Sequence, residues 1–284
     1  MERIVVITGG SSGIGKAIAE RFAATGNTVY ELSRSGKSTP HIRHITCDLT
    51  DSAQIKAAFA ELAQSCRRID ILINNAGMGV SGATEFIAED EARRLMDIDF
   101  FAAWLCAKEA LPLLRKSKSA KIINISSVAA VFAIPFQSFY SAAKAAINAL
   151  SSALALELRP FGIQVTAFMP GDINSGFTAA RVKNEAGSEL YGQAIADSVA
   201  IMERDESRGM EPYRIADAVY NLCAKAKLKP LYTCGLKYKF FLLLGKILPC
   251  SLIQLILRMM YCPHKKQPHK KQTPTTAEDN TPQQ

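Results

Sequence analysis

The stretch VVITGGSSGIGKAIAE, at the start of the chain, constrains the fold most strongly. It joins an apolar, β-branched run at Arg3–Ile7 to a helical pattern at Ile14–Thr25, which Gly26 closes. Glycines lack a Cβ atom, so they allow a tight turn and a close backbone approach to a ligand. The free N–H groups at a helix start favour a phosphate. The sequence therefore predicts a strand, a glycine turn with G-x3-G-x-G spacing from Gly9, and a helix that together bind a pyrophosphate.

The alternation of apolar runs and helical patterns continues along the chain. Strands are predicted at 28–32, 69–73, 121–125, 163–168 and about 230–234, and helices at 52–66, 91–115 and 138–159. Strands that read as continuous apolar runs between helices are typical of a parallel sheet covered on both faces. We therefore predict a single-domain α/β fold with a doubly wound parallel sheet, Rossmann-like, whose ligand site lies beyond the carboxyl ends of the strands.

The composition divides the chain into three parts. Residues 1–235 form the predicted domain, in which the polar, glycine-containing segment 172–212 is expected to be a helical flap over the site. Residues 236–262 form an apolar and basic extension. Residues 263–284 hold mostly Lys, Pro, Thr and Gln, a composition that predicts a disordered tail.

Charge and cysteine content exclude several function classes. The net charge is +8, but the 11 basic residues between Val219 and Ala277 carry the excess, and residues 1–217 have a net charge of −1. This distribution, without a base-reading motif, argues against nucleic-acid binding. The 7 cysteines are scattered, which predicts reduced thiols and no metal site. No signal peptide is recognisable, so we expect a cytoplasmic protein.

The end of the second predicted strand indicates the cofactor. Folds that prefer NAD(H) place an acidic residue there to hold the ribose hydroxyls. Here the tip is Ser33-Arg34, and an arginine can pair with a 2′-phosphate. Glu31 lies two residues earlier and is expected to point elsewhere. We therefore predict a preference for NADP(H), with NAD(H) as the alternative; Arg34 could also be an ordinary surface residue.

A tyrosine and a lysine share a helix face in SFYSAAK. Tyr140 and Lys144 are four residues apart, so on a helix they are neighbours. Taken alone, such a pair is most simply a solvated helix edge with an extended lysine. Other motifs decide its meaning.

Several motifs together resemble the short-chain dehydrogenase/reductase family. TGGSSGIG resembles its cofactor turn, CDLTD its adenine contact, NNAG a motif after the fourth strand, and PGDINS a motif near the nicotinamide. Ser127, Tyr140 and Lys144 match its Ser, Tyr and Lys, and the C-terminal extension is similar to those of members acting on steroid- or retinoid-like alcohols. The cofactor-binding residues predicted from these motifs are Thr8, Gly9, Ser11, Ser12, Gly13, Ile14, Gly15, Ser33, Arg34, Asp48, Leu49, Asn75, Ala76, Gly77, Tyr140, Lys144, Pro170, Gly171, Ile173 and Ser175.

The resemblance implies an oxidoreductase that transfers hydride between the nicotinamide and a carbonyl or secondary alcohol. Tyr140 is then the general acid/base, and its ordinary pKa of about 10 is expected to be lowered by the Lys144 ammonium. Ser127 would orient the substrate oxygen and stabilise charge on it. The alternative is a non-catalytic dinucleotide-binding or membrane-associated regulatory protein on the same fold.

One predicted catalytic residue departs from the family pattern. Where the family often has an asparagine, LMDIDFFAAW places Asp99. An ionised carboxylate near Lys144 would stabilise the ammonium and raise its pKa, which predicts an active enzyme with a shifted pH profile. Asp99 could instead cap a kink without reaching the lysine.

The extension and the aromatic residues predict the partners. After Pro249, apolar residues including Leu252 and Met259 are expected on one helix face, and Gln254, Arg258 and Tyr261 on the other. An amphipathic helix with flanking lysines predicts, with equal weight, either peripheral contact with the inner membrane face or packing on the body or on a second subunit. Apolar residues near the motifs predict a lipophilic alcohol or ketone as substrate. These residues are Phe132, Phe136, Phe139 and Phe177, together with Pro135. The resemblance implies a homo-oligomer.

Overall fold

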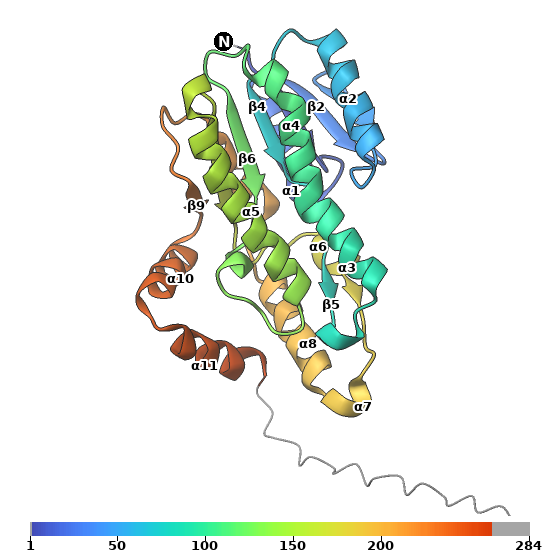
Figure 1. Ribbon diagram of the computed structural model, residues 1–284, viewed down its shortest axis with the longest axis vertical. Helices are drawn as coiled ribbons and strands as arrows, with labels where there is room; N and C mark the ends of the chain where they lie inside the picture. The colour runs from blue at the N-terminus through green and yellow to red at the C-terminus, as the bar shows by residue number, and fades with distance from the viewer. Residues whose placement is uncertain (1, 263–284) are drawn as a thin grey trace, which may run out of the picture.

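Seven parallel strands form the central sheet of the molecule, whose computed structural model describes residues 2–262 (Figure 1). The strands are β1 (Ile4–Thr8), β2 (Thr28–Ser33), β3 (Ile42–Thr46), β4 (Ile71–Asn74), β6 (Lys121–Ile125), β7 (Gln164–Met169) and β9 (Leu231–Thr233). Their order is β3-β2-β1-β4-β6-β7-β9, with Val5 of β1 paired to Val29 and Ile71. The strand order reverses between β1 and β4, which opens a crevice at the carboxyl ends of the strands.

Helices cover both faces of this sheet (Figure 1). On one face, α1 (Gly13–Ala23) packs against α9 (Pro212–Cys223), and Phe22 and Ile215 are fully buried between them and the sheet. On the other lie α2 (Ser52–Ser65), α4 (Ala102–Leu114) and α5 (Ser138–Glu157). The predicted single-domain, doubly wound α/β fold is therefore confirmed, because each apolar strand is buried from both sides.

The edge strand β3 was not predicted from the sequence. Its residues IRHIT mix polar and apolar side chains, and only Ile45 is buried. An edge strand of this composition lacks the continuous apolar run that marks the central strands. Short 3₁₀ turns at Thr84–Phe86, Val128–Ala130 and Arg159–Phe161 complete the loops.

The helix predicted at 91–115 is interrupted by a π turn. Helix α3 (Glu89–Met96) leads into π-helical backbone at Asp97–Phe101 and then into α4, with Pro112 in the last turn of α4. A π turn contains an extra residue and often occurs at functional sites. Here it holds Asp99, which is 2% exposed.

The segment predicted as a flap folds over the carboxyl ends of the strands. It contains α6 (Phe177–Ala180), α7 (Ser188–Tyr191) and α8 (Ala194–Ser207). Strand β8 (Val182–Lys183) of this segment pairs in parallel with β5 (Val80–Ser81), which follows β4. This small second sheet ties the segment to the domain.

The C-terminal extension is two helices, α10 (Leu236–Ile247) and α11 (Cys250–Tyr261). Helix α10 continues through Gly245 and Lys246, and the chain turns at Leu248 and Pro249. Of the predicted polar face of α11, Tyr261 is buried, whereas Gln254 and Arg258 are exposed, as are Leu252 and Met259 of the apolar face. Among residues 2–262, no helix combines the length and apolarity that a membrane crossing needs. The predicted tail at 263–284 lies outside the described residues.

Candidate active site

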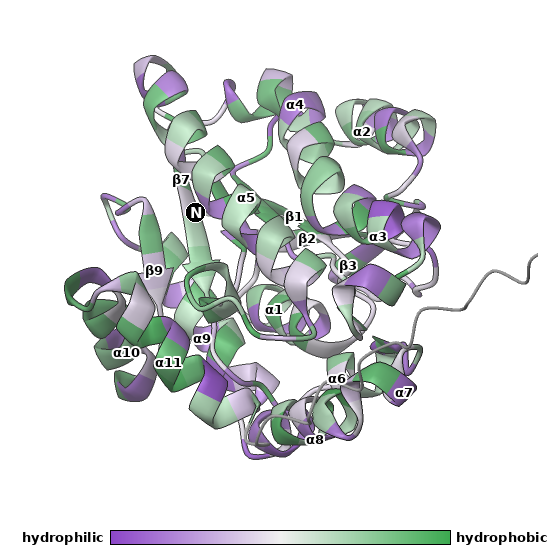
Figure 2. Ribbon diagram, turned by 60° about the horizontal axis from the view of Figure 1, so that its bottom comes forward, coloured by the Kyte–Doolittle hydropathy of each residue, from purple (hydrophilic) through white to green (hydrophobic). Residues whose placement is uncertain are grey.

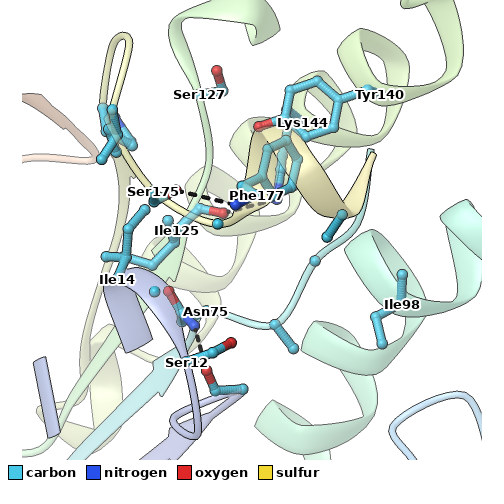
Figure 3. Close-up of a pocket in the computed structure, with 18 of the residues that line it drawn as sticks. Ser12, Ile14, Asn75, Ile98, Ile125, Ser127, Tyr140, Lys144, Ser175 and Phe177 are labelled. Atoms are coloured by element: carbon cyan, nitrogen blue, oxygen red, sulfur yellow. Dashed lines mark hydrogen bonds between the residues drawn. The ribbon is translucent and has the colours of Figure 1, made fainter. Parts of the chain in front are cut away.

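A cavity of about 510 Å³ opens at the carboxyl ends of the central strands. Every predicted cofactor-binding residue lines it except Thr8 and Gly15, and Ser127 lines it too. Figure 3 shows that these side chains come from distant segments, with Ser12 and Asn75 at one end and Tyr140 and Lys144 at the other. The fold therefore brings the separate sequence motifs to one site.

Glycines give the turn between β1 and α1 its shape. Gly9 and Gly13 have φ values of +66° and +53°, which L side chains rarely adopt. A Cβ atom on Gly15 would overlap the Gly9 carbonyl, whereas no atom lies within 4 Å of a Cβ built on Gly13. The turn is therefore tight on its inner side and open toward the cavity, a cradle that suits a phosphate at the start of α1.

Thr8 and Asn75 hold this turn against the end of β4. The Thr8 hydroxyl accepts hydrogen bonds from the backbone N–H groups of Asn75 and Ala76 at 2.9 and 3.1 Å. The Asn75 amide donates to the carbonyls of Thr8 and Gly9 at 3.1 and 3.2 Å. Thr8 and Gly15 thus shape the cradle from behind, although both were predicted as cofactor contacts.

The end of β2 presents a cation to the same cavity. Arg34 is exposed and lines the cavity beside Ser33 and Asp48. The backbone N–H of Thr50 is the largest influence that lowers the pKa of Asp48, and Arg34 lowers it further. Glu31, as predicted, points elsewhere, since its buried carboxylate lies 2.6 Å from His44 Nδ1.

The predicted Ser, Tyr and Lys residues meet where β6 and α5 adjoin. Ser127 follows β6, and its hydroxyl accepts a hydrogen bond of 3.1 Å from the Ala129 N–H. The Lys144 ammonium lies 5.4 Å from the centre of the Tyr140 ring and donates to the Ile125 carbonyl at 3.2 Å. The two side chains share one buried helix face, so the solvated-edge interpretation is wrong: Lys144 is only 4% exposed.

Asp99 forms a buried ion pair with Lys144. Its Oδ2 lies 2.9 Å from Lys144 Nζ, and its Oδ1 accepts a 2.7 Å hydrogen bond from the Met78 N–H. A Cβ atom on Gly77 would lie 2.9 Å from Oδ2, so this glycine leaves room for the pair. The alternative in which Asp99 never reaches the lysine is wrong.

Burial and mutual charge set the pKa values of this cluster. Burial would lower the pKa of Lys144, but the Asp99 carboxylate beside it raises that pKa above its ordinary value. Burial also raises the pKa of Asp99, more than Lys144 lowers it. For Tyr140, burial is the largest influence and raises the pKa, against opposing effects of Lys144 and Ser127. The lowered Tyr140 pKa expected from the sequence is therefore not found; the ammonium acts in the expected direction but is outweighed.

Of the five residues expected to form an apolar substrate surface, Phe177 lines the cavity, 5.7 Å from Tyr140 between ring centres. Phe136 instead packs on Tyr191, and Phe139 joins a separate apolar cluster. Sequence reasoning missed Ile134, Gln137 and Glu206 among the lining residues. Glu206 reaches the cavity from α8, where it pairs with the buried Arg181. No local pattern near residue 206 indicates this position.

Tyr238 of α10 is a second residue that the sequence did not reveal. Its hydroxyl donates to Asp172 Oδ2 at 2.6 Å and accepts from the Asp172 N–H at 2.9 Å. Its ring lies so close to Gly171 that a Cβ atom there would overlap it. The extension therefore supports the loop at 170–172, which forms one wall of the cavity.

Comparison with known proteins agrees with this arrangement. The family model for short chain dehydrogenases matches residues 3–186. A 3-ketodihydrosphingosine reductase of Bacteroides thetaiotaomicron is 38% identical over 91% of this chain and 98% of its own length. A probable short-chain type dehydrogenase/reductase of Helicobacter pylori is 32% identical over 93% and 99%.

Solved structures are similar over the same span. A short-chain dehydrogenase from Streptomyces avermitilis superposes with a TM-score of 0.79 at 28% identity, covering 91% of this chain and 95% of that one. The residues, the cavity and these relatives lead to one assignment: the chain belongs to the short-chain dehydrogenase family of oxidoreductases, which act on CH–OH and C=O groups.

Proposed function

We propose that this chain is an NADP(H)-dependent oxidoreductase that transfers hydride between the nicotinamide and a carbonyl or secondary alcohol of a lipophilic substrate. The observation that carries the proposal is the convergence of Ser127, Tyr140 and Lys144 with the glycine turn on one cavity. A non-catalytic dinucleotide-binding protein on this fold would have no need for an acid/base tyrosine beside a buried lysine.

The residues at the cavity suit the cofactor. The open side of the glycine turn would hold the pyrophosphate, Asp48 and Leu49 the adenine end, and Arg34 the 2′-phosphate. Asn75 to Gly77 and Pro170 to Ser175 would flank the nicotinamide. NAD(H) remains the alternative, because Arg34 forms the only part of this proposal that distinguishes the two cofactors.

The protein residues would perform the proton chemistry. The cofactor, when bound, supplies or accepts the hydride. Tyr140 would donate a proton to the carbonyl oxygen in reduction and remove it from the hydroxyl in oxidation. Ser127 would hydrogen-bond the same oxygen and stabilise its charge. Lys144 would favour the tyrosinate, and Asp99 is a positioning residue that holds Lys144 protonated and in place.

The substrate is proposed to be a lipophilic ketone or alcohol. Ile134, Phe177 and Ala180 give the cavity an apolar wall near Tyr140. The Bacteroides relative is named for the reduction of 3-ketodihydrosphingosine. A long-chain ketone of this kind is therefore the first compound to test.

Two further proposals concern assembly and location. We propose a homo-oligomer, since Phe101, at the end of the π turn, and Trp104, in α4, are 44% and 41% exposed. Large exposed aromatic side chains of this kind suit a contact between subunits. We also propose that the protein works in the cytoplasm, in peripheral contact with the inner membrane face. We propose no nucleic-acid partner for this protein.

The cofactor proposal is tested by fluorescence titration with NADPH and NADH. Arg34→Ala should weaken NADPH binding at least tenfold and leave NADH binding nearly unchanged, because only NADPH carries the phosphate that the guanidinium pairs with. Arg67→Ala, an exposed arginine elsewhere, is the matched control. Equal binding of both cofactors, unchanged by Arg34→Ala, would redirect the search to NAD-linked alcohol oxidation.

The catalytic proposal is tested with long-chain ketones and NADPH. Tyr140→Phe should keep cofactor binding but lose at least a hundredfold in turnover, because the proton donor is removed. Cofactor binding without turnover of any ketone or alcohol in the wild type would support the non-catalytic alternative.

A further inference from the structure

The C-terminal extension leaves a large apolar surface exposed. We define the outer face of the extension as Phe240, Leu243, Ile247, Leu255, Met259 and Met260, which are 45–69% exposed. Figure 2 shows long apolar stretches in α10 and α11 at one corner of the molecule. A helix that only packed on the body would turn these residues inward. Large exposed apolar side chains gathered on two consecutive helices indicate an interaction site.

The charged side chains of α10 and α11 have one sign, and one of them, Lys237, pairs with Asp172 of the domain at 3.7 Å. Lys237, Lys239, Lys246 and Arg258 are exposed on the same two helices, and residues 236–262 contain no Asp or Glu. The sequence continues with four more lysines before Glu278. A second copy of the chain would be a poor occupant, because a symmetric contact would bring these cations together. An anionic surface would neutralise them.

Three contacts place the extension on the rim of the cavity. Tyr238 bonds to Asp172, which lines the cavity, and packs on Gly171. Gly245 lies against Phe132, in the loop that follows Ser127. Helix α11 packs on α8, which carries Glu206. A partner bound to the outer face of the extension would therefore lie beside the cavity.

We propose that the outer face of the extension docks on a bilayer containing anionic lipids, with its apolar side chains in the interface and its lysines against the headgroups. The inference rests on the proposed function in one respect: docking would place the cavity where a lipophilic substrate can enter from the bilayer. The protein lies on the membrane through two short amphipathic helices, and Tyr238 and Tyr261 fix these helices to the body.

Co-sedimentation of the full chain with vesicles tests the proposal. We expect binding to vesicles of phosphatidylcholine with phosphatidylglycerol, weak binding to phosphatidylcholine alone, and release at high salt. Lys239→Gln combined with Lys246→Gln should weaken binding about 30-fold. Ile247→Glu combined with Met259→Glu should weaken it about 100-fold or more. Leu156→Glu, with an equally exposed side chain on α5, should bind as the wild type does.

Two of the remaining outcomes overturn the membrane proposal, and a third separates it from the proposed function. Equal binding to both vesicle types, or none to either, would refute an anionic membrane site. A change of oligomeric state in Ile247→Glu with Met259→Glu, measured by analytical ultracentrifugation without vesicle binding, would make a second copy the occupant. Vesicle binding does not require turnover. If the wild type is inactive on every ketone, the proposed function is overturned. If Tyr140→Phe still binds vesicles in that case, the membrane site stands.

Discussion

The pair of Asp99 and Lys144 gives the sharpest test of the site, through the substitution Asp99→Asn. Asparagine has the same shape and can keep the hydrogen bond from the Met78 N–H. Its amide group would then face the Lys144 ammonium, donor against donor, at the position where Oδ2 now lies 2.9 Å from Nζ. The substitution therefore removes one charge of a buried pair with little change in volume.

The expected effect follows from the distance and the burial. Two unit charges 2.9 Å apart attract by about 6 kcal/mol at an effective dielectric constant of about 20. Much of this attraction offsets the cost of taking both ions from water. Removing one partner leaves the other buried alone, which typically costs about 3–5 kcal/mol. We expect about 3 kcal/mol, because the asparagine keeps its backbone partner.

The pH dependence distinguishes the ion pair from a simple packing effect. The folded-state pKa of Lys144 is raised above its ordinary value, so the stabilisation is present at neutral pH. It is lost as the pH rises past about 10.4 and through the folded-state value. The difference in unfolding free energy between wild type and Asp99→Asn should therefore be present at neutral pH and shrink in alkali.

Urea denaturation at several pH values measures this difference. Asp97→Asn, in the same π turn but without an ion pair among residues 2–262, is the matched control and should have a small effect at every pH. Asp99 also raises the pKa of Tyr140, so Asp99→Asn should move the pH profile of alcohol oxidation to lower pH while Lys144 stays protonated. Unchanged stability together with an unchanged profile would refute the role assigned to Asp99.

Three further substitutions test the frame of the site by chemical denaturation. Gly77→Ala should cost about 1–3 kcal/mol, because its Cβ would press on Asp99 at 2.9 Å, whereas Gly176→Ala, with open space around its Cβ, should cost little. Tyr238→Phe should cost about 1–3 kcal/mol, because Asp172 loses both hydrogen bonds; the exposed Tyr213→Phe is its control, and equal stability of the two would contradict the contact. Thr8→Val should cost about 2–4 kcal/mol, because two backbone N–H groups lose their acceptor, and a smaller loss would mean that water replaces the hydroxyl.

The sequence predicts well where the glycine turn and the Ser127, Tyr140 and Lys144 cluster lie, because their signals are local. Gly9, Gly13 and Gly15 stand out through backbone geometry that other residues resist. Ser127 and Tyr140 lie in different elements, but a parallel sheet brings the ends of its strands to one edge. Once a strand is predicted to end just before Ser127, Ser127 itself can be placed at this edge of the sheet.

The residues that the sequence does not reveal reach the site through contacts between distant segments. Tyr238 bonds to a residue 66 positions earlier, and Glu206 lines the cavity from a helix whose pattern is ordinary. The direction of the Tyr140 pKa also depends on burial, which no spacing expresses. The missed strand β3 shows the same limit, because half-polar edge strands resemble loops.

The packing of α11 shows why amphipathicity alone cannot orient a helix. The sequence predicts correctly that apolar and polar residues separate around the helix. It does not say which side meets the body. Here two phenols, Tyr238 and Tyr261, are the buried side chains of α10 and α11, while Leu252, Met259 and Met260 are exposed. Tyrosine can anchor in this way because its ring packs and its hydroxyl still finds a polar partner, as Tyr238 does at Asp172. The exposed apolar residues are then available for the bilayer contact that we propose.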